Sequence, residues 1–251
     1  MNTGFRKRLL AGDRLIGTMV TLGYPEMGEI LAGAGFDWLF LDAEHSPMTA
    51  TALQHVMQGS RAEMPCLVRL AAGDQVSVKK ALDIGAAGII APLINTAEQA
   101  AEVVRWAKYW PQGSRGVGLG RASGYGRLFQ EYLESANEET VVVVQTEHIE
   151  AVENIAEIIQ VPGVDAVFVG PYDLSASLGL MGQVTHPDVQ AAIGRVTQVC
   201  REAGVPLGIF GVTAKAVQPF IEQGYTLIVA GTDALLLGAA AAEIFNQLSG
   251  R

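Results

Sequence analysis

Ionisable side chains follow two apolar segments near the points where those segments end. The stretch FLDAEHSP places Asp42, Glu44 and His45 directly after an apolar run, and Arg69 lies near the end of the segment CLVRL. Histidine transfers protons near neutral pH, and a carboxylate three residues earlier can orient it and raise its basicity. A buried guanidinium needs an anionic partner, which a substrate carboxylate or enolate would provide. These residues indicate acid–base chemistry on an anionic substrate; the alternatives are a structural histidine and an ion pair of Arg69 with Asp42 or Glu44.

Two more carboxylates and an amide follow later apolar runs. The segment VVVVQTE ends with Gln145 and Glu147, and GPYDLS carries Asp173. Side chains alternate along a strand, so Gln145 and Glu147 share one face of a valine-rich strand. Two carboxylates with a nearby amide, and without a cysteine or histidine cluster, suit Mg²⁺ or Mn²⁺ better than Zn²⁺. The alternative is that each acid caps the following helix, for which Asp173 is well placed.

The elements that must position these residues form a regular series. Short β-branched or aromatic runs alternate with longer stretches of helical period, a pattern typical of parallel βα units. Eight such units in 251 residues predict an α/β fold of the (β/α)8 TIM barrel type, with an open doubly wound sheet as the alternative. A barrel would gather the ionisable residues at the carboxyl ends of its strands. The predicted strands cover 15–20, 36–42, 66–70, 88–93, 141–147, 165–170, 206–210 and 226–231.

Composition limits the classes of partner. The absence of a linker or low-complexity tract predicts a single domain over 1–251. A formal net charge of −9 with scattered basic residues argues against nucleic-acid binding. Without an apolar run of about 18 residues or a signal-peptide pattern, we expect a cytoplasmic protein that does not enter the membrane. Cys66 and Cys200, far apart in sequence, are expected to be reduced and buried.

Some motifs carry weaker signals. The glycine- and arginine-rich segment 113–127 follows a predicted helix and does not fit a dinucleotide-binding motif, so we interpret it as an interface loop or a loop that gates the substrate. The segments GIFGV and VAGTDALLL lie where many barrels bind a phosphate, and close packing of glycine is the equal alternative. We interpret His55 and His186 as structural.

Six motifs, in order over essentially the whole chain, resemble the HpcH/HpaI family of class II pyruvate aldolases, of which the 4-hydroxy-2-oxoheptanedioate aldolases are the type. The motifs are LDAEHSP, LVRL, GSRGVGLGRAS, VVQTEHIEAVENI, GVDAVFVGPYDLSASLG and HPDVQAAI. The resemblance implies a carbon–carbon lyase that uses a divalent metal ion (Mg²⁺, Mn²⁺ or Co²⁺) to cleave 4-hydroxy-2-oxo acids reversibly to pyruvate and an aldehyde, through a metal-bound pyruvate enolate. It also implies a homo-oligomer, commonly a hexamer, with small-molecule substrates.

The resemblance also assigns roles to individual residues. It makes Glu147 and Asp173 the metal ligands and Arg69 the residue that stabilises the enolate. His45 becomes the base for the 4-hydroxyl, with Asp42 as its carboxylate partner. It further implies a set of substrate-binding residues, namely Gln145, Gly170, Pro171, Tyr172 and Phe210. No Schiff-base lysine is required, and no lysine falls on a predicted strand.

Three positions depart from the usual family pattern. His148 in QTEH can reach the rim if its strand ends early, Tyr172 is expected to narrow the substrate mouth, and Phe210 is expected to change the size of the aldehyde pocket. The alternative function is a related lyase that acts on an acyl-CoA ester or decarboxylates oxaloacetate. A remote alternative is a non-catalytic ligand-binding barrel, whose ligand binding would survive EDTA.

Overall fold

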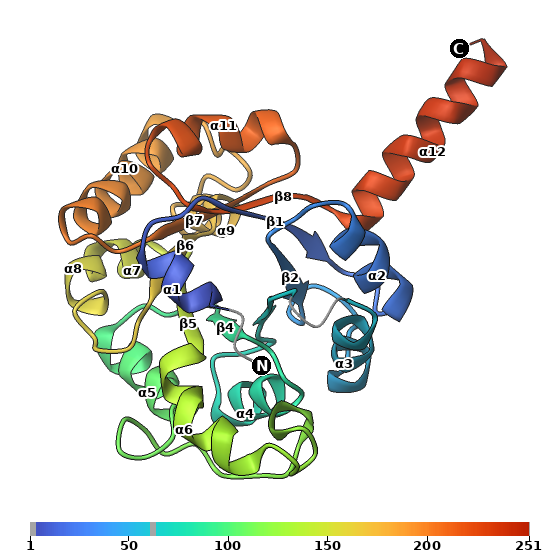
Figure 1. The fold of residues 1–251 in the computed structure, drawn as a ribbon. Coiled ribbons are helices and arrows are strands. Elements are labelled where there is room, and N and C mark those ends of the chain that lie inside the picture. Colours follow the sequence, from blue (N-terminus) through green and yellow to red (C-terminus); the bar gives the residue numbers. More distant parts are fainter. Residues whose placement is uncertain (1–3, 61–63, 251) are drawn as a thin grey trace.

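A computed structural model describes residues 4–60 and 64–250. Eight parallel strands close into a barrel in which each strand pairs with its sequence neighbours and β8 pairs with β1 (Figure 1). This confirms the predicted (β/α)8 class. The strands are β1 Leu15–Val20, β2 Trp38–Asp42, β3 Cys66–Arg69, β4 Gly88–Ala91, β5 Val141–Thr146, β6 Ala166–Val169, β7 Leu207–Gly211 and β8 Leu227–Thr232.

Helices surround the barrel and connect successive strands (Figure 1). Several begin at a side-chain cap: Thr49, Asp74 and Thr213 each accept a hydrogen bond from a backbone N–H of the first turn. No helix within the described residues is long and apolar enough to cross a membrane. The helices are α1 Phe5–Leu10, α2 Pro25–Gly33, α3 Ala50–Gly59, α4 Gln75–Asp83, α5 Ala97–Ala107, the 3₁₀ helix η1 Arg121–Ser123, α6 Phe129–Glu139, α7 Ile149–Glu153, α8 Ile155–Ile158, α9 Pro171–Ser177, α10 Pro187–Glu202, α11 Ala214–Glu222 and α12 Asp233–Ser249.

Aromatic residues fill the inside of the barrel. Phe5 of α1 packs on Trp38, Trp38 on Phe40, and Phe40 on Phe168, with ring centroids 5.9, 6.1 and 5.6 Å apart. Because side chains alternate along β2, Trp38 and Phe40 share the interior face with Asp42, which ends the strand. The packed interior therefore supports Asp42 from below.

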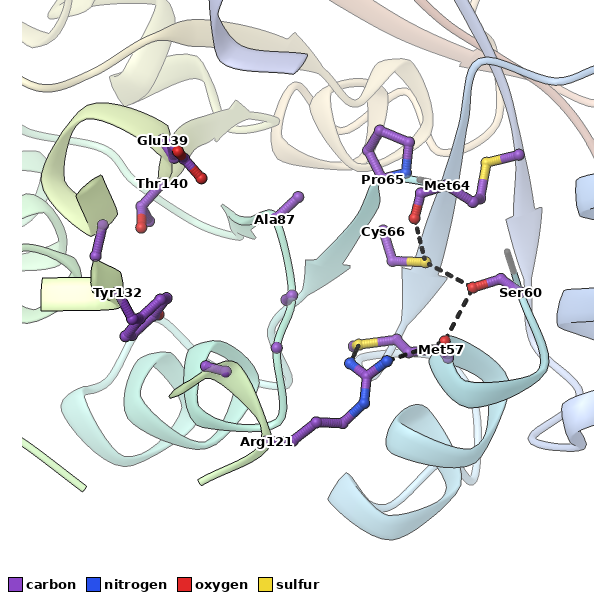
Figure 2. Close-up of a pocket in the computed structure, with 14 residues that line it drawn as sticks. Met57, Ser60, Met64, Pro65, Cys66, Ala87, Arg121, Tyr132, Glu139 and Thr140 are labelled. Carbon is purple, nitrogen blue, oxygen red and sulfur yellow. Dashed lines mark hydrogen bonds between the residues drawn. The ribbon is translucent and has the colours of Figure 1, made fainter. Parts of the chain in front are cut away.

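The segment 113–127 lies at the amino-terminal end of the strands, opposite the carboxyl ends. Arg121 donates hydrogen bonds to the carbonyl oxygens of Met57 and Ile84, and it lines a cavity together with Cys66 and Thr140 (Figure 2). Cys66 begins β3, and Thr140 directly precedes β5. The predicted role as a gate over the site of its own chain is therefore wrong, and the interface interpretation stays a prediction.

Both cysteines are buried and neither forms a disulfide, as expected. Burial raises the pKa of Cys66 to about 11 and that of Cys200 to about 12. Because a thiolate is the reactive form, these thiols are chemically quiet at neutral pH.

The last helix, α12, leaves the barrel instead of packing on it (Figure 1). Its start is held by Asp233, whose buried carboxylate accepts hydrogen bonds from the backbone N–H groups of Thr21 and Leu22. A carboxylate at this helix start repels a phosphate, so the structure favours packing over phosphate binding after β8.

Candidate active site

A buried ion pair joins the ends of β2 and β3. The two strands pair in register with Asp42 opposite Arg69. Arg69 Nε donates to Asp42 Oδ1 at 2.9 Å and Arg69 Nη2 to Asp42 Oδ2 at 2.8 Å, a bidentate arrangement. Arg69 Nη1 lies 3.2 Å from Glu44 Oε2, and the guanidinium carbon lies 5.4 Å from the centroid of the Phe40 ring. The ion pair left open as an alternative is thus present with both acids.

We predicted that Asp42 is the carboxylate partner of the His45 side chain, but the structure pairs Asp42 with Arg69 instead. The Asp42 carboxylate binds Arg69 and also accepts the backbone N–H groups of Glu44 and His45 at 3.0 and 3.3 Å, which fixes the turn after β2. The His45 side chain is 65% exposed, and its Nε2 lies 3.8 Å from Glu44 Oε2. The turn sends the imidazole outward while the strand sends Asp42 inward, so Glu44 is the carboxylate that faces His45.

Glu147 lies just after β5 and is buried. Its Oε1 accepts the backbone N–H of Leu93 at 2.8 Å, and its Oε2 accepts a hydrogen bond from the side-chain amide of Gln145. Burial raises the pKa of Glu147, the two hydrogen bonds and Arg69 oppose that shift, and the nearby Asp173 carboxylate adds to it. Both oxygens are therefore held in place beside a second acid and a guanidinium.

The Leu93 amide was missed by sequence reasoning because a main-chain donor has no residue signature. Leu93 adopts a left-handed backbone conformation (φ 54°), which is uncommon for a residue other than glycine. The conformation accompanies the hydrogen bond from its N–H to the carboxylate of Glu147. The left-handed turn after β4 is therefore part of the support of Glu147.

Gly170, predicted to bind substrate, provides room for Glu147. A Cβ atom at position 170 would lie 2.9 Å from Glu147 Cβ and 3.1 Å from Glu147 Oε2. These separations are shorter than van der Waals contact, so any larger residue at position 170 must displace the Glu147 side chain.

If Glu147 holds a divalent ion, as the family resemblance implies, Gly170→Ala should weaken Mn²⁺ binding by about 10- to 100-fold, the range for supports of a metal ligand. Titration of Mn²⁺ followed by electron paramagnetic resonance measures this without any substrate. Gly194→Ala in α10 is the matched control, because a Cβ there would meet nothing within 4 Å. Unchanged Mn²⁺ affinity in Gly170→Ala would show that Glu147 does not hold the ion.

The residues around Glu147 fit a hard divalent ion. Asp173 lies in the first turn of α9 and is exposed, and Gln145 Oε1 is buried without a hydrogen-bond partner. Across the described residues, no group of three or more His, Cys, Asp or Glu could hold a metal ion. Glu147, Asp173 and Gln145 would offer two carboxylates and an amide oxygen, which suits an ion that keeps waters or takes substrate oxygens as further ligands.

The other residues predicted to bind substrate or to reach the site lie partly at the rim of the barrel and partly in its interior. Pro171 begins α9, and Tyr172 beside it is exposed. Phe210 near the end of β7 packs against the barrel interior. His148 caps α7, with its Nδ1 accepting the backbone N–H of Glu150 at 3.2 Å, so we assign it a structural role although β5 ends before it.

Fold and site together define a (β/α)8 barrel with an enzyme-type cluster at the carboxyl ends of its strands. Residues 16–240 match the family described as HpcH/HpaI aldolase/citrate lyase, and the chain belongs to this family.

Curated relatives agree with this assignment. The chain is 40% identical over 244 residues to a 4-hydroxy-2-oxo-heptane-1,7-dioate aldolase of Shigella sonnei, covering 96% of this chain and 93% of that protein. It is 39% identical to a 4-hydroxy-2-oxovalerate aldolase of Rhodococcus jostii, covering 98% and 96%. A crystal structure of a family member from Burkholderia cenocepacia superposes with a TM-score of 0.94 at 35% identity over 98% of this chain and 99% of that one. These aldolases are carbon–carbon lyases, the class predicted from the sequence.

Proposed function

We propose that this protein is a divalent-metal-dependent aldolase that cleaves 4-hydroxy-2-oxo acids reversibly to pyruvate and an aldehyde. The observation that carries the proposal is the buried Arg69, fixed by Asp42 and Glu44, at the same rim as the neighbouring acids Glu147 and Asp173. The names of the relatives support the same reaction. Cleavage removes the 4-hydroxyl proton, breaks the C3–C4 bond and leaves its electron pair on the pyruvate half as an enolate.

Arg69 would stabilise the charge that develops on the enolate. Its Nε and Nη2 donate to Asp42, and its Nη1 lies 3.2 Å from Glu44 Oε2 in an ion pair without a hydrogen bond, so an N–H of Nη1 would be available to a substrate oxygen. Because both acids fix the guanidinium before the substrate binds, little reorganisation is needed as the charge appears.

Glu147, Asp173 and the free Gln145 Oε1 would hold the divalent ion, Mg²⁺, Mn²⁺ or Co²⁺. When bound, the ion would supply Lewis acidity toward the 2-oxo and carboxylate oxygens of the substrate. The hydrogen bonds from Leu93 and Gln145 keep the Glu147 carboxylate oriented for this role.

The direct test is cleavage of 4-hydroxy-2-oxovalerate by EDTA-treated protein, with pyruvate measured by lactate dehydrogenase. Pyruvate release should stop in EDTA and return with Mg²⁺, Mn²⁺ or Co²⁺. Cleavage at an unchanged rate in EDTA would contradict a metal-dependent reaction. Absence of cleavage, together with turnover of oxaloacetate or an acyl-CoA ester, would contradict the aldolase proposal and support the alternative function of a related lyase.

His45 is the proposed base for the 4-hydroxyl, oriented by Glu44. His45→Ala should lower kcat for cleavage by about 10²- to 10⁴-fold, the range for a positioned acid–base group, while pyruvate binds nearly as before. Stopped-flow cleavage assays and pyruvate titration measure the two quantities. His148→Ala is the control, because His148 caps α7. An unchanged kcat in His45→Ala would exclude His45 as the base.

We also propose that the protein forms a homo-oligomer, with α12 in the contact. Beyond Asp233, every residue of α12 is exposed, including Leu237, Ile244, Phe245 and Leu248. A contiguous apolar surface of this kind marks a protein–protein contact. The family resemblance favours a hexamer. Light scattering after size-exclusion chromatography should give a multiple of 26.5 kDa, and Ile244→Glu should lower that mass. A wild-type monomer would contradict the proposal.

A further inference from the structure

Large apolar side chains stand exposed around the mouth of the site. They follow four different strands at the carboxyl ends: Tyr24 after β1 is 67% exposed, Leu93 after β4 is 56%, Tyr172 after β6 is 54%, and Val212 after β7 is 46%. Leu93 binds Glu147 through its amide, and Tyr172 precedes Asp173, so two of the four adjoin the acids proposed to hold the ion.

The charges at this rim are mostly negative. All segments that lead from a strand to the next helix lie within the described residues, and none of them carries lysine or arginine. The same holds for the connection 178–186 between α9 and α10. Arg69, at the end of β3, is already bound to Asp42 and Glu44. The first turns of the following helices add one exposed cation, Lys215 of α11.

This inference rests on the proposed aldolase function, in which pyruvate and the aldehyde would meet different protein groups. The pyruvate half has Arg69 and the carboxylate-bound ion as its cationic partners. The aldehyde half would face exposed tyrosine, leucine and valine. An aldehyde that carries its own carboxylate would have to lose hydration beside acids without gaining a cation, which is costly, whereas an alkyl or aryl body would bury apolar surface.

We propose that the preferred acceptor is an uncharged aldehyde with an alkyl or aryl body, recognised by Tyr24, Leu93, Tyr172 and Val212. In the synthetic direction, the methyl carbon of pyruvate loses a proton and forms a bond to the aldehyde carbon. The aldehyde oxygen gains a proton, so no further reactant is consumed. The acceptor preference thus differs from the one expected from a relative named for a heptanedioate substrate.

A matched pair of aldehydes tests the proposal. Butanal and 4-oxobutanoate have the same chain length and differ in a methyl or a carboxylate at the far end. With the metal-loaded wild-type protein and pyruvate, kcat/KM for butanal and for benzaldehyde should exceed that for 4-oxobutanoate by at least about tenfold. Equal or better use of 4-oxobutanoate would overturn the proposal.

Three variants test whether residues at the mouth set the preference for butanal over 4-oxobutanoate. Tyr172→Lys should shift the ratio toward 4-oxobutanoate by about tenfold or more, because it adds a cation at the mouth. Tyr172→Gln is the uncharged control and should reduce butanal use without improving 4-oxobutanoate use. Lys215→Ala should leave the ratio unchanged. No shift in Tyr172→Lys, or a selective loss of 4-oxobutanoate turnover in Lys215→Ala, would overturn the assignment of the mouth.

Exchange of the pyruvate methyl protons needs no aldehyde, so it tests the aldolase function separately from the acceptor proposal. Exchange together with a preference for 4-oxobutanoate would overturn the acceptor proposal alone. Absence of exchange with every metal would overturn the aldolase function and the acceptor proposal together.

Discussion

Glu147→Gln is expected to abolish metal-dependent cleavage and to weaken Mn²⁺ binding by at least about 100-fold, beyond the usual effect of changing a residue that only supports a ligand. The substitution removes the negative charge of the buried carboxylate from the proposed donor set. It also places an amide nitrogen against the Leu93 N–H or the Gln145 amide, both of which donate to the native carboxylate. Calorimetric titration with Mn²⁺ measures the binding loss without substrate.

The control for this variant is Glu157→Gln, an exposed glutamate on α8. It removes the same charge from the chain and should bind Mn²⁺ as the wild type does. Glu147→Gln with wild-type Mn²⁺ affinity would place the ion elsewhere and would remove Glu147 from the proposed site.

Arg69→Lys is expected to lower the rate of pyruvate enolisation by about 10²- to 10³-fold, the cost of removing one oriented donor from a developing oxyanion. Lysine keeps the positive charge beside Asp42 but cannot make the two parallel hydrogen bonds that orient the guanidinium. Methyl-proton exchange followed by NMR measures the rate. Exchange at the wild-type rate in Arg69→Lys would exclude the proposed role.

Arg69→Ala is less informative because it combines two effects. It leaves the buried Asp42 carboxylate without its partner, which we expect to cost about 3–5 kcal/mol of unfolding free energy. Denaturant unfolding of both variants separates the effects: the lysine variant should be much closer to wild type in stability. Equal stability of Arg69→Ala and wild type would show that the ion pair contributes little.

The barrel could be predicted from sequence because each strand is a short, almost wholly apolar run. β1 falls on the predicted 15–20, and β5 ends one residue before the predicted 147. Alternation along β5 also placed Gln145 and Glu147 together, and the structure joins them by a hydrogen bond. These successes depend on local periodicity, which the sequence records directly.

The partner of Asp42 depends on geometry that spacing does not record. His45 is three residues from Asp42 in sequence, yet the carboxylate binds Arg69, 27 residues away, because β2 and β3 pair in register. The Leu93 amide is a main-chain group in a left-handed turn, and no residue type in the sequence indicates that this amide binds Glu147. Similarly, the apolar sequence of α12 fits both a helix of the outer ring and a projecting helix, and the structure shows the second.

The most direct test of the aldolase proposal is proton–deuteron exchange at the pyruvate methyl group in D₂O, followed by NMR with no aldehyde present. The EDTA-treated wild-type protein should show no exchange above the background rate, and Mg²⁺, Mn²⁺ or Co²⁺ should restore it. Exchange that persists unchanged in EDTA, or that fails to appear with any of the three ions, would contradict a metal-dependent pyruvate enolate as the centre of this protein's chemistry.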